Sequence, residues 1–118
     1  MTVVVEVEAL ELHGRHGVEP EEREHGQTFL FDLRLDVGDA ALSDEIADAV
    51  DYVEVVECVR AVSDGHAYHL LEALAAAVAD AIAARFPVEC VRVRVRKPEV
   101  RPGGLTVSWT AATVERRS

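Results

Sequence analysis

The segment Thr28-Phe29-Leu30-Phe31-Asp32-Leu33-Arg34-Leu35-Asp36-Val37 places an apolar side chain at every second position. Such alternation is typical of a β-strand that buries one face and leaves the other outside the core. The inward set is Phe29, Phe31, Leu33, Leu35 and Val37, and the outward set is Asp32, Arg34 and Asp36. The chain is therefore predicted to fold around a sheet with one apolar face and one charged face.

The segments around this strand predict three further strands and two helices. Residues 3–12 are predicted as a strand, and a switch in their apolar parity predicts a β-bulge near Ala9. One helix is expected from Asp51, with Glu54 as capping-box partner, to about Ser63, and another from about Tyr68 to Arg85. The remaining strands are residues 88–96 and 105–114. The order ββααββ predicts an α+β fold, in which an antiparallel four-stranded sheet carries both helices on one face.

Two of these segments carry specific burial patterns. The second helix is expected to bury Leu70, Leu74, Val78 and Ile82, which follow helical spacing. The last strand is expected to place Leu105, Val107, Trp109 and Ala111 on one face, after a turn at Pro102-Gly103-Gly104.

The composition is that of a single globular domain spanning residues 1–118. A formal net charge of −10 argues against nucleic-acid binding, because neutralising phosphates requires a surplus of Lys and Arg. No apolar run reaches the ~18 residues of a membrane span, and the first residues lack the pattern of a signal peptide. Cys58 and Cys90 stand too far apart for a zinc or redox motif. We therefore expect a cytoplasmic protein that binds neither nucleic acid nor membranes.

The connection between the first two predicted strands, residues 13–23, is too long for a simple hairpin turn. Long connections inside compact domains tend to be functional. His13 and His16, with His25 nearby, raise the question of a metal site. His-x-x-His on a loop is a weak pattern, however, and the chain has no H-E-x-x-H helix. We expect no metal here, and a loop histidine that orients its neighbours.

Lys97 is the only lysine of the chain and lies between the end of a predicted strand and Pro98. Alternation places it on the opposite face from Arg96. A partly desolvated lysine can have a lowered pKa and take part in proton transfer. The alternative is a surface lysine whose stem packs along apolar neighbours while its ammonium stays in water.

Two carboxylates and one phenol are further candidates. Glu22 in the long connection and Glu72 at the start of the second helix can each accept two parallel N–H bonds from the amidine-like edge of a planar heterocycle. The alternatives are a solvated loop charge for Glu22 and a favourable helix N-terminal charge for Glu72. Tyr52 follows the N-cap residue Asp51, where its phenol can pass a proton or simply pack.

Several short motifs occur in one order along essentially the whole chain and together resemble the dihydroneopterin aldolase family. They are Gly14-Arg15-His16-Gly17-Val18-Glu19-Pro20-Glu21-Glu22, Gly26-Gln27 with Phe29 and Asp32, Ser43-Asp44 with Asp51-Tyr52, Leu70-Leu71-Glu72, and Val93-Arg94-Val95-Arg96-Lys97-Pro98. Two positions depart from the family pattern: Arg15 replaces a common aromatic residue and His69 a common asparagine.

The resemblance implies a lyase that cleaves 7,8-dihydroneopterin by a retro-aldol reaction to 6-hydroxymethyl-7,8-dihydropterin and glycolaldehyde, in folate biosynthesis. It implies that Lys97 is catalytic, that Glu72 anchors the pterin beside the Leu71 backbone, and that Glu22 contacts the substrate. Tyr52 would enter the site from a neighbouring subunit, bind substrate and shuttle protons. No cofactor, metal or lysine Schiff base is implied, because the C=N bond of the pterin accepts the electrons.

The implied architecture is the tunnelling fold, in which subunits of a homo-oligomer, a tetramer ring or an octamer, close their sheets into a barrel with active sites between subunits. The charged sheet face would line the tunnel. Two alternatives stay open within the same fold. One is a C2′ epimerase of dihydroneopterin or its triphosphate, and the other is a non-catalytic pterin-binding oligomer.

Overall fold

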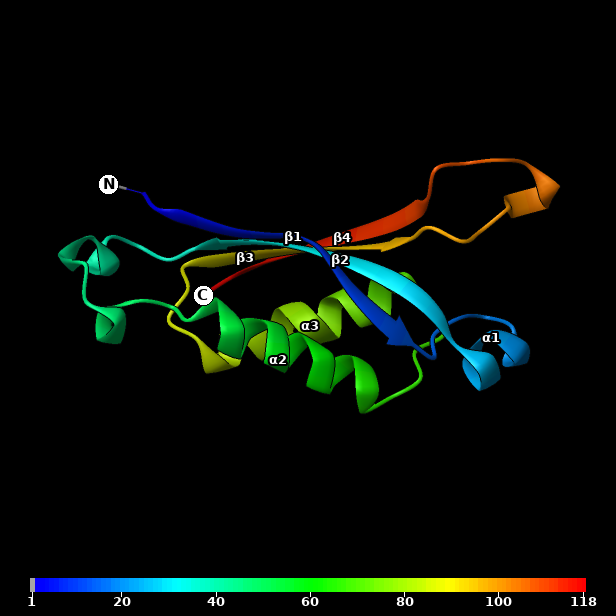
Figure 1. Ribbon diagram of the computed structural model, residues 1–118, viewed down its shortest axis with the longest axis horizontal. Coiled ribbons are helices and arrows are strands. Elements are labelled where there is room, and N and C mark those ends of the chain that lie inside the picture. The colour runs from blue at the N-terminus through cyan, green and yellow to red at the C-terminus, as the bar shows by residue number, and fades with distance from the viewer. Residues whose placement is uncertain (1) are drawn as a thin grey trace.

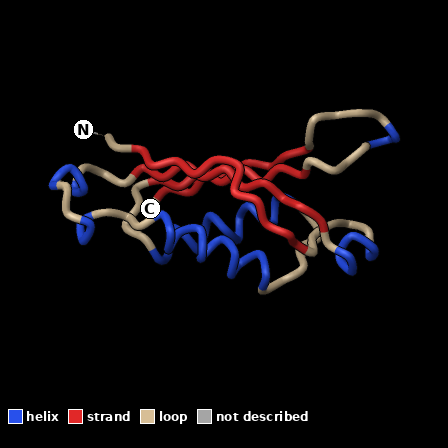
Figure 2. The backbone as a smooth tube through the Cα atoms, viewed as in Figure 1, coloured by secondary structure: helices blue, strands red, loops and turns tan. Residues whose placement is uncertain are grey.

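A four-stranded antiparallel sheet forms one layer of the protein, and two helices form the other (Figures 1 and 2). The computed structural model describes residues 2–118. The strands are β1 (Val4–Gly14), β2 (Gln27–Asp36), β3 (Cys90–Lys97) and β4 (Thr110–Arg117), paired in that order. Helices α2 (Tyr52–Asp64) and α3 (Leu71–Arg85) lie on one face, and a short helix α1 (Pro20–His25) joins β1 to β2. The predicted α+β fold is confirmed.

The core lies between the sheet and the two helices. Phe29, Phe31, Leu33 and Leu35 of β2 are buried, as the alternation predicted, whereas Val37 is only partly buried. The other buried side chains of this core include Val91, Val93 and Val95 of β3, Val55 and Val59 of α2, and Leu74, Val78 and Ile82 of α3. No helix within residues 2–118 is long and apolar enough to cross a membrane.

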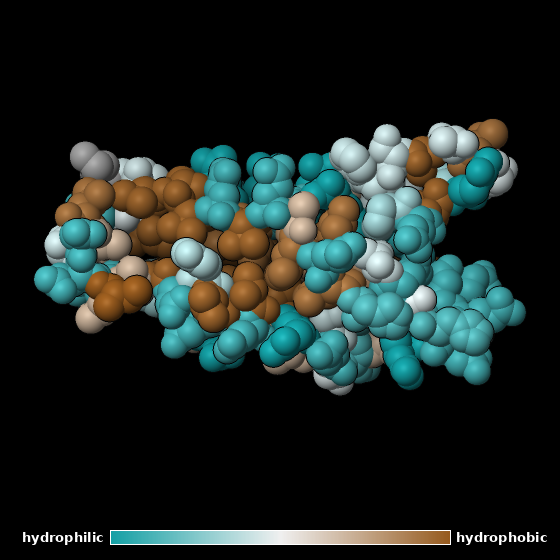
Figure 3. Space-filling model, in the orientation of Figure 1, coloured by the Kyte–Doolittle hydropathy of each residue, from teal (hydrophilic) through white to brown (hydrophobic). Residues whose placement is uncertain are grey.

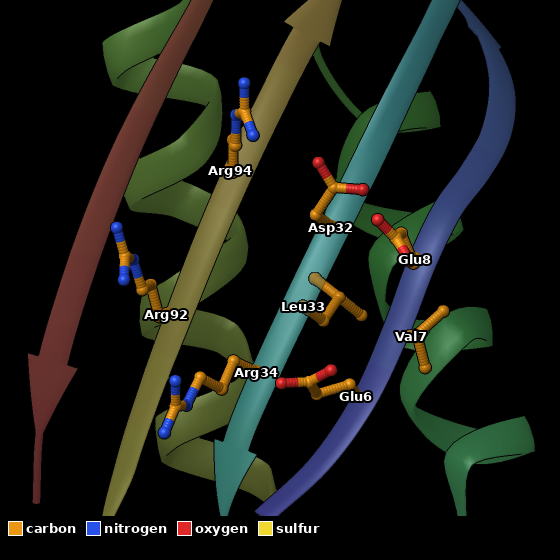
Figure 4. A pocket seen from close by; sticks show the side chains of 8 residues that line it. All are labelled: Glu6, Val7, Glu8, Asp32, Leu33, Arg34, Arg92 and Arg94. Atoms are coloured by element: carbon orange, nitrogen blue, oxygen red, sulfur yellow. The ribbon is translucent and has the colours of Figure 1, made fainter.

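The outer face of the sheet is charged. Figure 4 shows Glu6 and Glu8 on β1 and Arg92 and Arg94 on β3 on either side of a shallow cavity of about 300 Å³. Asp32 of β2, in the same row, pairs with Arg96 (Asp32 Oδ2 to Arg96 Nε, 2.8 Å). This face therefore matches the predicted polar face.

The bulge predicted near Ala9 is present. The β1–β2 register shifts between Val7 and Leu10, and Ala9 has φ of 56°. The Ala9 N–H donates to Asp32 Oδ1 at 2.8 Å, and the same carboxylate pairs with Arg96. The bulge is thus tied through β2 to the end of β3.

Helix α2 begins where the sequence predicted it. The Asp51 side chain accepts the N–H of Val53 (2.9 Å), one residue before the predicted partner Glu54. The helix runs to Asp64, one residue beyond the predicted end.

Helix α3 begins at Leu71, and the predicted start at Tyr68 was wrong. The Tyr68 N–H donates to the ring of His16 at 3.0 Å, and the Tyr68 carbonyl accepts the Gly17 N–H at 2.9 Å. This segment therefore bonds to the β1–β2 connection instead of forming the first turn of the helix. Leu70 is consequently the N-cap residue, and it is 50% exposed where the helical spacing predicted burial.

Strand β4 begins at Thr110, and the predicted start at residue 105 was also wrong. Its first residue pairs with Lys97, the last residue of β3, because Pro98 follows and has no N–H to continue the ladder. Leu105 and Val107 therefore lie in an exposed connection, and Trp109 lies at its base, just before β4 begins.

Candidate active site

A cavity of about 210 Å³ lies at the end of the molecule where α1, the start of α3 and the end of β3 meet (Figure 1). Its walls come from residues 16–18 and 22 of the β1–β2 connection, residues 69–72, and the ends of β3 and β4 at Lys97, Val100 and Thr110. Four of the residues singled out from the sequence, Glu22, Leu71, Glu72 and Lys97, line this one cavity.

Lys97 and Glu22 form an ion pair in this cavity. The Lys97 Nζ lies 2.7 Å from Glu22 Oε2, and the two side chains are 14% and 31% exposed. Lys97 reaches this place because it continues the inward series of Val91, Val93 and Val95 on β3. A charge-assisted hydrogen bond shielded from water fixes both groups more firmly than the same pair would be fixed on the surface.

Glu22 is held by the fold of its own connection. Pro20 begins α1, and Glu22 lies in the first turn of that helix. The Arg23 guanidinium donates to the carbonyl oxygens of Gly17 and Val18 (2.8 and 2.7 Å) and folds the connection back on itself. Gly17 lies directly against the glutamate, since an added Cβ would be 1.8 Å from Glu22 Oε2.

Glu72 lies in the first turn of α3, beside Leu71. The first N–H groups of a helix have no partner inside the helix, and the helix dipole stabilises a carboxylate there. A carboxylate with a neighbouring backbone group can bind the donor edge of a planar heterocycle through parallel hydrogen bonds.

His16 is buried at the back of the same cavity. Desolvation by burial, with a smaller contribution from His66, lowers the pKa of its ring from 6.5 to about 4, and Asp64 opposes that shift. The sequence marked His16 only as a histidine that orients its neighbours, because its burial depends on contacts with distant segments. His69 and Thr110 also line the cavity. The sequence marked His69 only as a departure from the family pattern, and it gave no signal for Thr110.

Tyr52 does not reach this cavity within one chain. It is 63% exposed at the start of α2, and α2 begins at the end of the molecule opposite to α1 (Figure 1). His13 lies beside Gly26, and within residues 2–118 no group of three or more His, Cys, Asp or Glu side chains is arranged to hold a metal ion.

Comparisons with known proteins agree with one another. The family model for dihydroneopterin aldolase (FolB) matches residues 5–114. A dihydroneopterin aldolase of Streptomyces coelicolor is 42% identical over 112 residues, which cover 93% of this chain and 92% of that protein. A solved structure of a putative dihydroneopterin aldolase from Vibrio cholerae has a TM-score of 0.90 at 30% identity, covering 100% of this chain and 99% of that one.

The Escherichia coli dihydroneopterin aldolase, solved in complex with neopterin, has a TM-score of 0.85 at 29% identity and covers 97% of this chain and 98% of that one. The family match includes the residues that line the cavity and reaches into all four strands. This chain belongs to the dihydroneopterin aldolase family.

Proposed function

We propose that this protein cleaves 7,8-dihydroneopterin by a retro-aldol reaction, giving 6-hydroxymethyl-7,8-dihydropterin and glycolaldehyde. The observation that carries the proposal is the Lys97–Glu22 ion pair (2.7 Å) in a cavity that also holds Leu71 and Glu72 at the start of α3. This arrangement combines a proton-transfer group with a binding edge for a planar heterocycle. Neopterin in the related E. coli enzyme supports a pterin as the ligand.

Glu72 and Glu22 bind and orient the substrate. The Glu72 carboxylate accepts two parallel N–H bonds from the amidine-like edge of the pterin, with the Leu71 backbone beside it. Glu22 contacts the substrate from the opposite wall, next to Lys97. Holding the ring from two sides aligns the scissile bond with the proton-transfer groups.

Lys97 donates a proton to the ring nitrogen and later accepts it back. The C1′–C2′ bond breaks as the C2′ hydroxyl loses its proton, and its electron pair moves into the C=N bond of the ring, whose nitrogen takes up a proton. The C1′ carbon then gains a proton and the ring nitrogen loses one, which restores the C=N bond. The pterin itself is the electron sink, so the proposed reaction needs no metal and no Schiff base at Lys97.

The proposed site is completed by a second copy of the chain, which supplies Tyr52 to bind substrate and shuttle protons. Both edge strands, β1 and β4, have backbone groups free for pairing with another sheet. Figure 3 shows an apolar band on the side of the molecule between the sheet and the helices, with polar surface around it. These features support a homo-oligomer, a tetramer ring or an octamer, with active sites between subunits.

Incubation with 7,8-dihydroneopterin, with glycolaldehyde and the C2′ epimer assayed together, tests the proposal. Lys97→Ala should lower kcat by about 10²–10⁴, and Lys97→Arg should also be slow because a guanidinium stays protonated. Arg92→Ala, on the outer face of the same strand, is the matched control and should keep the wild-type rate. Dialysis against EDTA should leave turnover unchanged.

A wild-type kcat in Lys97→Arg would show that Lys97 acts only through its positive charge and not by proton transfer. Formation of the epimer without glycolaldehyde would show that the protein is an epimerase, and loss of turnover on chelation, restored by zinc, would contradict a metal-free reaction.

A further inference from the structure

One buried side chain, that of His16, joins three segments around the cavity. The residue is 1% exposed, and its ring packs edge-on against Phe29 of β2, with ring centroids 5.2 Å apart. Its Nδ1 accepts the backbone N–H of Tyr68 at 3.0 Å, and its Nε2 lies 2.9 Å from Ser63 Oγ on α2. The ring therefore links the β1–β2 connection, the last turn of α2 and the segment that leads into α3.

Only the neutral ring with its proton on Nε2 satisfies both contacts. A backbone N–H can only donate, so Nδ1 has no proton, and Nε2 carries the proton and donates it to Ser63. A doubly protonated ring would place an N–H against the N–H of Tyr68. The lowered pKa of His16, about 4, keeps the ring neutral at physiological pH.

The next residue strengthens the link. The Gly17 N–H donates to the Tyr68 carbonyl at 2.9 Å, so residues 16 and 17 hold Tyr68 by two hydrogen bonds that run in opposite directions. Gly17 packs directly on Glu22, and Tyr68 precedes Glu72 by four positions in the sequence. The two hydrogen bonds to Tyr68 therefore connect the segment that carries Glu22 with the segment that carries Glu72.

We propose that His16 is a positioning residue, whose neutral ring holds the segments carrying Glu22 and Glu72 at a fixed separation. The inference rests on the proposed function. A ligand that bonds to both carboxylates binds more tightly when their separation is preset, since no ordering cost arises on binding. The titratable groups around the ring are Asp64 at the end of α2, His66 just after it, and Tyr68, whose ring centroid lies 5.6 Å away. In the cavity they are Glu22, His69, Glu72 and Lys97.

Two substitutions distinguish the hydrogen bond of His16 to Tyr68 from its hydrogen bond to Ser63. His16→Asn places an amide oxygen near the Nδ1 position and keeps an acceptor for Tyr68, whereas His16→Gln reaches toward Ser63 and loses that acceptor. Neopterin is titrated by calorimetry, and kcat and KM are measured for 7,8-dihydroneopterin. We expect His16→Gln to weaken neopterin binding and raise KM about tenfold. His16→Asn should lose less, and both should lower kcat far less than Lys97→Ala does.

Val59→Ala is the matched control, because Val59 is fully buried on α2 and does not line the cavity. It should lower stability and leave neopterin affinity unchanged. If His16→Gln keeps the wild-type neopterin affinity and KM while the wild type releases glycolaldehyde, the role of His16 is overturned and the proposed function stands. A wild type that releases no glycolaldehyde would overturn the proposed function itself.

A measurement on the wild type covers the case in which the His16 variants fail to fold. Nitrogen-15 NMR of the ring should show an unprotonated Nδ1 and a protonated Nε2 down to about pH 5, and neopterin should slow hydrogen exchange of the Tyr68 amide. A ring protonated on Nδ1, or a Tyr68 amide whose exchange ignores neopterin, would overturn the inference.

Discussion

The β1–β2 and β3–β4 connections flank the same cavity but are held in different ways. The β1–β2 connection is anchored by side chains that reach other segments: His16 bonds to Ser63 and Tyr68, and Glu22 pairs with Lys97. Its backbone also bonds to the segment before α3. This wall of the cavity is complete within one chain.

The β3–β4 connection, residues 98–109, projects from the sheet as an arm (Figure 1). Within the described chain, the hydrogen bonds found for its turn join Arg101 to Gly104 and Pro102 to Leu105, all inside the arm. Leu105 is 71% exposed, whereas Trp109, at the base, stacks on Arg94 and Arg96 with guanidinium-to-ring distances of 5.4 and 5.1 Å.

The difference concerns which wall of the proposed site is held by contacts within one chain. An anchored connection can place a carboxylate to within a fraction of an ångström, which binding and catalysis require. An arm with exposed apolar side chains is typical of a surface that another protein covers. We infer that the arm side of the cavity is completed by the second copy of the chain that we propose as the source of Tyr52.

Among the changes that compare the two connections, the largest effect is expected from Gly17→Ala in the anchored connection. The new Cβ would lie 1.8 Å from Glu22 Oε2 and 2.6 Å from Glu22 Cβ, so Glu22 and the backbone of residue 17 must shift relative to each other. We expect this shift to disturb the Glu22–Lys97 ion pair. A displacement of about 1 Å in such a site costs about 10²-fold in rate. The measurement is kcat/KM for 7,8-dihydroneopterin. A wild-type kcat/KM would show that the position of Glu22 does not matter.

An intermediate effect is expected on stability as the pH falls. The pKa of His16 is lowered from 6.5 to about 4 in the folded protein. Between these values the unfolded chain binds a proton that the folded chain does not, so the free energy of unfolding falls as the pH falls. The decrease is about 2 kcal/mol by pH ~5 and levels off below pH ~4.

Urea denaturation of the wild type and His16→Asn at neutral and acidic pH isolates this contribution. The variant should lack it, while the contributions of the carboxylates stay common to both proteins. An identical pH dependence in the two proteins would show that His16 titrates normally in the folded state.

The smallest effect is expected from Gly103→Ala in the arm, which is the counterpart of Gly17→Ala. Gly103 has φ of 61°, and an added Cβ meets nothing within 4 Å. Only the left-handed backbone is penalised, by about 1 kcal/mol, and kcat/KM should stay near the wild-type value. A loss as large as that of Gly17→Ala would show that the arm is anchored as firmly as the other connection.

The fold could be predicted largely because its strands and helices follow local patterns. The alternation from Phe29 to Leu35, the bulge at Ala9 and the cap at Asp51 are local features, and all three are present. The start of α3 could not be predicted, because it is set by the bond between Tyr68 and His16, which are 52 positions apart. The start of β4 was missed because it depends on where its partner strand ends.

In the candidate site, too, the residues could be predicted from local motifs, whereas their contacts with distant segments could not. The family motifs singled out Glu22, Leu71, Glu72 and Lys97, and the structure brings these four to one cavity. The Lys97–Glu22 pair spans 75 positions, and no pattern in the chain encodes its distance. The connection that holds Glu22 contains a short helix, α1, which was not predicted, because six residues are too few for a periodic pattern.

Mixing two inactive variants tests most directly the claim that one wall of the site belongs to a second chain. Tyr52→Phe and Lys97→Ala subunits are dissociated together and reassociated, and glycolaldehyde release is measured. Random assembly leaves about one site in four with both native residues when neighbouring subunits share each site. We therefore expect about a quarter of the activity of wild-type protein taken through the same treatment. Mixed oligomers that stay inactive while the treated wild type recovers would contradict a shared site.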